Sequence, residues 1–340
     1  MKAIYLKKYG NSASAFEIKE TPIPKASKGE VVIKVACFGL NFADVVARRG
    51  LYPDAPSNPV VLGYDVAGII ESVGEDVTTF KIGQRVMAFT RFGGYAEYVK
   101  TVETGVALMP DTLEYAAATA LVTQGSTAYF CAYESTVLHA GDRVLIHAAA
   151  GGVGSLLVQM AKQNKCIVYG TASTSKLNYL KQFGVDVAID YTQQDFAEVI
   201  RAHSKDQKID IVFDSIGGNT FKKSFKLLAP GGRIVTFGAA EQIGGNKTNK
   251  LGALKLAWGF GIFSPIQLLM GSKAIIGVNM LKIADHRPHI LSLCLREVLK
   301  MAEAGTIVPT VGKVFSADKI GEAHDYLESR QSVGKVVMAW

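Results

Sequence analysis

The feature that most constrains this chain is a glycine-rich turn that joins an apolar run to a helical pattern. Residues 149–154 read Ala-Ala-Gly-Gly-Val-Gly, after the apolar run 144–146 and before the helical pattern 155–162. Such a turn presents free backbone N–H groups and the positive end of a helix dipole, and its glycines let a pyrophosphate approach closely. A second apolar run follows at 166–170, so the pattern predicts a dinucleotide-binding unit. The expected phosphate contacts are Ala150, Gly151, Gly152, Val153 and Gly154.

The residues after the second apolar run indicate which dinucleotide binds. NAD sites place an Asp or Glu about 20 residues after the glycines, where it binds the ribose 2′-hydroxyl. Here residues 171–176 read Thr-Ala-Ser-Thr-Ser-Lys. A carboxylate would repel a 2′-phosphate, whereas hydroxyls and a lysine donate hydrogen bonds to it. The stretch therefore predicts NADP(H); the alternative is that Lys176 only solvates the start of the next helix.

Apolar runs and helical patterns continue to alternate up to about residue 280. Further apolar runs lie at 187–190, 209–214 and 233–238, and a Pro-Gly-Gly at 230–232 is expected to end the preceding helix. This alternation is typical of an α/β fold, a doubly wound parallel Rossmann sheet with helices on both faces. Ligands of such sheets bind at the carboxyl ends of the strands. The strand-end residues expected to line the cofactor site are Ser215, Gly217, Phe237 and Gly238.

The first 120 residues follow a different pattern. Short β-rich runs at 31–36, 66–72, 86–89 and 95–99 are separated by Gly and Pro. They predict a mostly antiparallel, barrel-like domain. The chain closes with two helical patterns and a short apolar run. We predict a discontinuous first domain from residues 1–122 and 281–340, and a second domain from residues 123–280.

Charge and cysteine usage narrow the class of protein. The net charge of +7 is spread along the chain, so we expect a solvated basic surface and no nucleic-acid binding. Four widely separated cysteines and an N-terminus without a signal-peptide pattern predict a cytoplasmic protein. An apolar stretch at 254–270 is too short and too interrupted to read as a spanning helix. Its alternatives are a buried helix, a lid over an apolar pocket and a membrane-surface contact.

Several motifs in order resemble those of the medium-chain dehydrogenase/reductase superfamily over essentially the whole chain. They lie at 39–44, 50–53, 62–68, 73–74, 83–86, in the glycine-rich turn and at the closing Val333-Gly334-Lys335-Val336. Within the superfamily, the chain looks like the zinc-free quinone oxidoreductase (zeta-crystallin) family. The stretches 41–52, 170–176 and 254–270 are most similar to the branch that contains the vesicle amine transport protein, a membrane-associated relative.

This resemblance implies a GroES-like first domain, a Rossmann second domain and bound NADPH. It also implies a homodimer joined through the strand near residues 274–278. By motif position, the residues around the 2′-phosphate would be Ser173, Lys176 and Tyr191. The residues near the nicotinamide would be Asn41 and Thr127. We also expect cofactor contacts at Gly334 and Lys335 of the closing motif.

Two positions that bind catalytic zinc in alcohol dehydrogenases of this superfamily differ here. A Cys is replaced by Asn41 and a His by Tyr64. Neither Asn nor Tyr is a normal zinc ligand, so we expect no metal. We expect Asp65 to anchor local backbone or Arg85. Without a Lewis acid an alcohol is hard to oxidise, so the chemistry should suit an acceptor that is already electron-poor.

Reduction of such an acceptor places negative charge on an oxygen, which donors or water must stabilise. The expected donors are Asn41, Tyr52 and Tyr64, with Thr127 orienting the nicotinamide amide. Tyr52, Tyr64 or water would deliver the proton; the alternative for Tyr64 is that it only fills the former metal pocket. Two enzymatic functions fit these residues: reduction of a quinone, and reduction of the C=C bond of an enone, enal or enoyl thioester. The stretch 254–270 motivates a third alternative, a non-catalytic, membrane-peripheral NADPH-binding protein.

Overall fold

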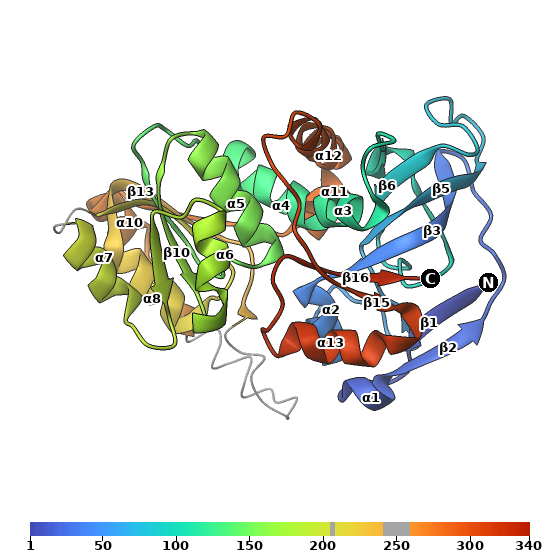
Figure 1. Ribbon diagram of the computed structural model, residues 1–340, viewed down its shortest axis with the longest axis horizontal. Helices are drawn as coiled ribbons and strands as arrows, with labels where there is room; N and C mark the ends of the chain where they lie inside the picture. Colours follow the sequence, from blue (N-terminus) through green and yellow to red (C-terminus); the bar gives the residue numbers. More distant parts are fainter. Residues whose placement is uncertain (205–207, 241–258) are drawn as a thin grey trace. The chain divides into compact units, whose positions relative to one another are not determined.

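The computed structural model describes residues 1–204, 208–240 and 259–340, and the chain forms two compact units (Figure 1). Unit 1 comprises Met1–Ser126 and Met280–Trp340, and unit 2 comprises Thr127–Asn279. Unit 1 is therefore built from two separate stretches of the sequence. Within the described ranges, no helix has the length and apolar character needed to cross a membrane.

Unit 2 is built on a six-stranded parallel sheet (Figure 1). In spatial order its strands are β11 (Val187–Asp190), β10 (Ile167–Ala172), β9 (Arg143–Ile146), β12 (Ile209–Asp214), β13 (Leu228–Thr236) and β14 (Ala274–Gly277). This is the order of a doubly wound Rossmann sheet, whose winding reverses between the first and fourth strands, here β9 and β12. The predicted fold class is confirmed. The reversal places the expected ligand site at the carboxyl ends of β9 and β12.

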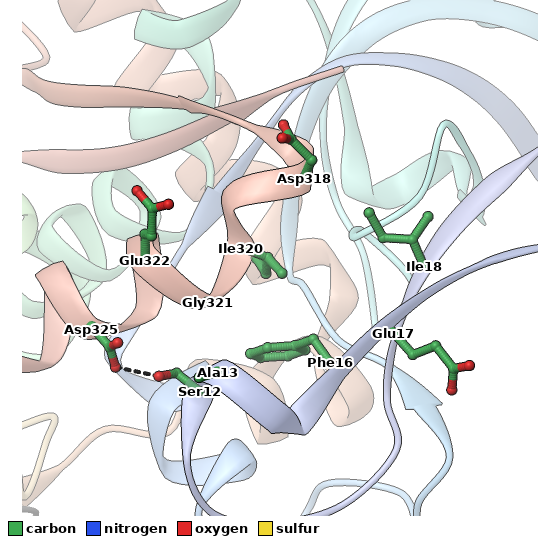
Figure 2. Close-up of a pocket in the computed structure, with 10 residues that line it drawn as sticks. All are labelled: Ser12, Ala13, Phe16, Glu17, Ile18, Asp318, Ile320, Gly321, Glu322 and Asp325. Carbon is green, nitrogen blue, oxygen red and sulfur yellow. Dashed lines mark hydrogen bonds between the residues drawn. The ribbon is translucent and has the colours of Figure 1, made fainter.

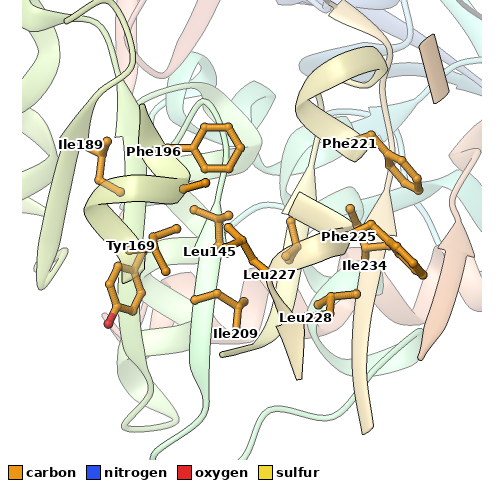
Figure 3. Close-up of a cluster of buried hydrophobic side chains, with 13 residues drawn as sticks. Leu145, Tyr169, Ile189, Phe196, Ile209, Phe221, Phe225, Leu227, Leu228 and Ile234 are labelled. Carbon is orange, nitrogen blue, oxygen red and sulfur yellow. The ribbon is translucent and has the colours of Figure 1, made fainter. Parts of the chain in front are cut away.

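Helices cover both faces of this sheet. The first pair is α5 (Gly152–Gln163) and α6 (Leu177–Gln182), and α7 (Phe196–Ser204) and α8 (Gly218–Leu227) lie on the other face. Shorter elements are α4 (Ser126–Tyr129), the π-helix η3 (Phe130–Glu134), the 3-10 helix η4 (Thr174–Lys176) and α10 (Pro265–Gly271). Figure 3 shows the core under α7 and α8, where Phe196, Phe221 and Phe225 pack with strand residues such as Leu145 and Ile234. Burial of these large apolar side chains is the main force that holds the helices on the sheet.

For unit 2, one expectation is wrong, and one of the three alternatives for residues 254–270 does not fit their described part. Residues 230–232 do not separate a helix from a strand, because they lie within β13; its register with β12 shifts between Ile209 and Ile211, and this irregularity accommodates the proline. The stretch 254–270 lies partly outside the described residues, and its described part is not a buried helix. Large side chains there are mostly exposed: Ile262 by 89%, Leu269 by 73% and Met270 by 81%.

Unit 1 contains a larger, mostly antiparallel sheet and a small one. The larger sheet runs β15 (Val311–Ser316), β16 (Lys335–Ala339), β3 (Glu30–Leu40), β5 (Asp65–Val73), β6 (Arg85–Phe89) and β8 (Val106–Leu108), with β7 (Tyr98–Val102) also paired to β3. The small sheet is β2 (Phe16–Glu20), β1 (Lys2–Leu6) and β4 (Val60–Val61). The strand predicted at 95–99 is found at 98–102. Tyr95 and Ala96 instead pair with β1, where Ile4 N–H donates to the Tyr95 carbonyl at 2.8 Å.

The helices of unit 1 are short except for α12. They are α1 (Ser12–Ala15), α2 (Phe42–Arg48), α3 (Tyr115–Ala120), α11 (Met280–His286), α12 (Pro288–Glu303) and α13 (Ile320–Glu328), with the π-helix η2 (Leu121–Gly125) and the 3-10 helices η1 (Glu103–Gly105) and η6 (Ala317–Lys319). β16, from the end of the chain, pairs antiparallel with β3, so that Val337 faces Gly39. This pairing brings Lys335 beside residues that precede it by about 300 positions.

Candidate functional site

The glycine-rich turn of unit 2 links β9 to α5 and leaves helix donors open. Gly151 caps α5, and the first intrahelical bond runs from Ser155 N–H to the Gly151 carbonyl at 2.9 Å. The N–H groups of residues 152–154 precede that bond and have no intrahelical acceptor. A Cβ atom on Gly154 would lie 2.3 Å from the Ala148 carbonyl oxygen, so only glycine allows this close approach of strand and helix. The five predicted phosphate-binding residues thus comprise the end of the turn and the first residues of α5, at the carboxyl end of β9.

A buried histidine that the sequence did not single out fixes the base of this turn. His147 follows β9, and its Nδ1 lies 3.1 Å from Thr171 Oγ1 while its Nε2 lies 2.8 Å from Ser224 Oγ. Burial lowers the pKa of this imidazole to about 3, so the ring is neutral and links two strands with α8. The only sequence signal for it is a polar residue at the end of an apolar run.

The three residues predicted around a 2′-phosphate come together where β10 and β11 end. Lys176 N–H donates to the Ser173 carbonyl at 2.9 Å, and Tyr191 N–H donates to the Ala172 carbonyl at 3.1 Å. The Lys176 side chain is half-buried, and burial lowers the pKa of its ammonium. Tyr191 is 45% exposed. One cation, one hydroxyl and one aromatic ring therefore belong to the segments that follow β10 and β11.

A carboxylate also lies in this region. Asp190 ends β11 opposite Ala172 and is buried. Its oxygens accept from the Thr174 hydroxyl and from both the N–H and the hydroxyl of Thr192, at 2.9 and 2.6 Å. The side-chain bonds to these two threonines keep its pKa low. Asp190 lies at the end of β11, whereas an NAD-specific carboxylate is expected at the end of β10.

The four predicted strand-end residues gather after β12 and β13. Asp214 Oδ1 accepts from the N–H groups of Ile216 and Gly217 at 2.8 and 3.1 Å, which shapes the turn after β12. Gly238 lies so close to Ser215 that a Cβ atom would be 2.7 Å from the Ser215 carbonyl oxygen. Phe237 follows the end of β13 directly, and its N–H donates to the Asp214 carbonyl at 3.0 Å. Thr127, the remaining predicted residue of unit 2, lies in α4 and is 7% exposed.

In unit 1, Asn41 belongs to a buried charged network. Its Nδ2 donates to Asp65 Oδ1, and its Oδ1 accepts from Lys335 Nζ at 2.8 Å. Lys335 Nζ also lies 2.5 Å from Asp65 Oδ2, and both charged residues are 0% exposed. Thr123 Oγ1 donates to Asp65 Oδ1 at 2.7 Å. The structure thus brings two predicted site residues, Asn41 and Lys335, into direct contact. It adds a carboxylate, Asp65, whose role the sequence did not indicate.

The expectation that Asp65 anchors local backbone or Arg85 is wrong. The Arg85 guanidinium instead donates to the carbonyls of Pro110, Asp111 and Leu113 at 3.1, 2.8 and 2.7 Å. The lysine partner of Asp65 was not identified because it is 270 residues away in the chain. The Lys335 ammonium contacts Asn41 and Asp65 inside unit 1. Its neighbour Gly334 has a left-handed backbone with φ of 59°.

A second buried carboxyl, Asp44, also contacts Asn41. Its Oδ2 accepts from the Asn41 backbone N–H at 2.8 Å, and its Oδ1 has no hydrogen-bond partner among the described residues. Burial raises the pKa of Asp44 to about 7, with a smaller contribution from the charge of Asp65. The site therefore contains one ion pair and one carboxyl that titrates near neutrality.

The two predicted tyrosines lie edge to face. The ring centroids of Tyr52 and Tyr64 are 6.5 Å apart at an interplanar angle of 90°. Tyr64 also packs on Phe89 and Phe92, is 4% exposed, and its hydroxyl makes no hydrogen bond of normal geometry within the described chain. Burial raises the pKa of both phenols, so both are neutral donors at physiological pH.

A separate surface cavity of about 300 Å³ lies in unit 1 between β2 and the start of α13 (Figure 2). Apolar Phe16, Ile18 and Ile320 lie beside the carboxylates that line it. Ser12 donates to Asp325 at 2.5 Å across its rim. The cavity contains none of the predicted site residues.

Comparisons with known proteins agree with this architecture. Residues 27–111 match the alcohol dehydrogenase GroES-like domain, and residues 183–338 match the zinc-binding dehydrogenase domain. The zebrafish synaptic vesicle membrane protein VAT-1 homologue is 34% identical over 93% of this chain, which spans 65% of that relative's length. The human VAT-1 homologue is also 34% identical, over 93% of this chain and 80% of its own length.

Solved structures of reductases have the same fold. Escherichia coli quinone oxidoreductase, solved with NADPH, superposes with a TM-score of 0.86 at 26% identity over the full length of both chains. The CurK enoyl reductase gives a TM-score of 0.86 at 26% identity, over 99% of this chain and 98% of its own. The chain therefore belongs to the medium-chain dehydrogenase/reductase superfamily of oxidoreductases, among the zinc-free, quinone oxidoreductase-like proteins near the VAT-1 homologues.

Proposed function

We propose that the protein is a zinc-independent, NADPH-dependent oxidoreductase that reduces quinones. The observation that carries the proposal is the hydrogen bonding of the Asn41 side chain. Asn41 stands at one of the two positions where zinc-dependent relatives bind their metal. Its amide is already held between Asp65 and Lys335, and a buried ammonium beside it opposes a second cation by charge repulsion. Tyr64, at the other position, is a neutral phenol and a poor metal ligand.

The residues of unit 2 fit a phosphorylated dinucleotide. The open N–H groups at the start of α5 suit a pyrophosphate, because they combine hydrogen bonding with the positive end of the helix dipole. Lys176, Ser173 and Tyr191 suit a 2′-phosphate, and the local hydrogen bonds of Asp190 limit its repulsion of that group. The E. coli relative solved with NADPH supports this choice. We further propose that Ser215, Gly217, Phe237 and Gly238 contact the same cofactor.

When bound, NADPH supplies the hydride that the acceptor takes up. The chain's own part is to stabilise the negative charge that develops on the acceptor oxygen and to provide a proton. We assign the donors to Tyr52, Tyr64 and the Asn41 Nδ2–H that does not bond Asp65. Thr127 would orient the nicotinamide amide, and Gly334 would contact the cofactor through its backbone. The proton comes from Tyr52, Tyr64 or water.

Reduction of an enone, enal or enoyl thioester is the second candidate activity, favoured by the likeness to the CurK enoyl reductase. The same residues serve both reactions, because both acceptors carry developing charge on an oxygen. NADPH oxidation measured side by side with a quinone and with an enone separates them by their kcat/KM values. Absence of turnover with both acceptors would contradict both assignments.

A role at membranes without catalysis has one structural observation in its favour. Ile262, Ile266, Leu269 and Met270 expose apolar side chains on and just before α10. Sedimentation with liposomes tests it: the intact protein should pellet with the vesicles, and a variant with Leu269 and Met270 replaced by Ser should pellet less. Equal behaviour of the two would remove this alternative.

We also propose that two chains pair through β14. Within the described part of the chain no strand pairs with the outer edge of β14, and an open edge is suited to pairing with a second copy. Sedimentation velocity should then give the mass of a dimer. A monomer at micromolar concentration would contradict this pairing.

A further inference from the structure

The buried polar network around Asn41 has a consequence beyond the proposed reaction, although it rests on that proposal for its catalytic meaning. The Asn41 amide lies between a carboxylate and an ammonium, with Nδ2 toward Asp65 and Oδ1 toward Lys335. The reverse orientation would face the carbonyl oxygen with the carboxylate and the NH₂ group with the ammonium, and both contacts would be repulsive. The two charges therefore define the orientation of this amide, which neutral partners would leave ambiguous.

The ion pair itself is not explained by stability. Two ions that leave water each lose several kcal/mol of hydration, and apolar side chains of similar volume are often as stable in such positions. Here both ions are 0% exposed. The backbone also makes room for them: a Cβ atom on Gly39 would lie 2.1 Å from Asp65 Oδ2 and 2.2 Å from Lys335 Cε. A pair accommodated in this way calls for a role other than stability.

A count of the hydrogen bonds of Asn41 shows which of its donors the Lys335–Asp65 pair leaves available. An Asn side chain has two N–H donors on Nδ2, and one of them bonds Asp65. The carbonyl end is taken by Lys335, which draws electron density from the amide and strengthens the second N–H as a donor. A donor held rigidly in a site of low dielectric stabilises developing negative charge more than a mobile one.

We propose that the Lys335–Asp65 ion pair is a positioning device that orients and polarises the Asn41 amide, so that its second N–H is presented to the acceptor oxygen. Lys335 and Asp65 then act through Asn41 and do not touch the acceptor. The fixed ammonium serves electrostatically in the region where zinc-dependent relatives hold a metal ion. No bond is made or broken within the pair during turnover.

A single and a double substitution separate this role from a structural one. Lys335→Met keeps most of the side-chain length and removes the charge; it should lower the melting temperature and also lower kcat about tenfold to a hundredfold. The NADPH Kd should change by less than about threefold. In Lys335→Met/Asp65→Asn no unpaired charge is left buried, so the melting temperature should recover while kcat stays low. Recovery of kcat together with the melting temperature would overturn the proposal.

A matched control is the buried Arg48, which donates to the Gly10 carbonyl at 2.8 Å and to Glu328, and belongs to the same unit. Arg48→Met should lower the melting temperature to a similar degree and leave kcat per folded molecule unchanged. An equal loss of kcat in both variants would mean that instability alone explains the effect.

A readout without turnover keeps this inference distinct from the proposed activity. The two side-chain N–H resonances of Asn41 in a ¹⁵N–¹H spectrum should be widely separated and slow to exchange in the wild type. In Lys335→Met they should approach each other and exchange faster. If the wild type reduces neither acceptor but the resonances behave in this way, the positioning holds and the activity proposal fails. Unchanged resonances in Lys335→Met would overturn the positioning itself.

Discussion

The two units differ in how their candidate ligand-binding groups are placed. Unit 1 buries a few charged groups and pairs them internally, as Lys335 and Asp65 do around Asn41. Unit 2 has N–H groups without an intrahelical acceptor at the start of α5, and it places the half-buried Lys176 just after β10. Unit 1 is therefore expected to lose its fold or its chemistry when a buried group changes, whereas unit 2 should lose affinity for one cofactor and keep its fold.

The largest loss of stability is expected from a substitution at Gly39, where the backbone lies closest to the Lys335–Asp65 ion pair. Gly39→Ala would place a methyl group 2.1 Å from Asp65 Oδ2, so the pair must separate inside the core. We expect a loss of about 3–5 kcal/mol in the free energy of unfolding, measured by denaturant titration. Gly277→Ala is the control, because nothing lies within 4 Å of the new methyl group, and it should be neutral. A stable Gly39→Ala variant would contradict the close packing of unit 1.

Reversing the charge of Lys176 should affect binding and not folding. In Lys176→Glu the carboxylate repels a 2′-phosphate, so we expect the NADPH Kd to rise roughly a hundredfold, about 2.7 kcal/mol, and the NADH Kd to change less than about threefold. Fluorescence titration measures both. Lys181→Glu, on the exposed part of α6, is the control for general charge. Equal losses for the two cofactors would refute the assignment of the 2′-phosphate site.

The buried carboxyl of Asp44 should make the stability of unit 1 depend on pH. The folded pKa of Asp44, about 7, lies above the unfolded value of about 3.9. Its favourable contribution is therefore complete below about pH 4 and is lost as the pH rises through 7. Asp65, Lys335 and Tyr95 are the titratable groups that act on it.

In Asp44→Asn that loss should disappear. Relative to the variant, the wild type should lose on the order of 2 kcal/mol of unfolding free energy between pH 5 and pH 8. Denaturant titrations at both pH values measure the difference. Parallel pH dependence of the two proteins would show that Asp44 is ionised throughout this range.

The smallest loss of stability is expected when an ion pair at the surface of unit 1 is removed. Lys100 Nζ lies 2.9 Å from Glu30 Oε2, but the lysine side chain is 45% exposed. Lys100→Ala should change the free energy of unfolding by less than about 1 kcal/mol, because water and salt screen the pair. A change as large as that of Lys335→Met would mean that burial does not distinguish the two pairs.

Much of unit 2 could be predicted because its information is local. Each strand end is followed within a few residues by a turn and a helix. The glycine pattern after one apolar run therefore indicated residues 149–154, and the end of the next run indicated residues 173–176. The errors were local as well. The proline at 230 suggested a turn, yet the strand accommodates it by a shift in register.

The network of unit 1 could not be predicted because its partners are far apart in the chain. Asn41 meets Lys335 through the pairing of β3 with β16, across 294 residues. The sequence marked both residues, but through family motifs that carry no information on their mutual contact. Asp65 appeared to have a nearby arginine, which instead bonds backbone carbonyls. Sequence patterns identify the candidate residues of such a site, whereas the pairing of strands determines which of them are in contact.

The most direct test of the account is the rate of NADPH oxidation by a quinone before and after exhaustive treatment with a metal chelator. Because Asn41 is held by Asp65 and Lys335, we predict turnover that is unchanged by the chelator and by added zinc. Turnover that is lost with the chelator and restored by zinc would contradict the account, as would the absence of turnover before treatment.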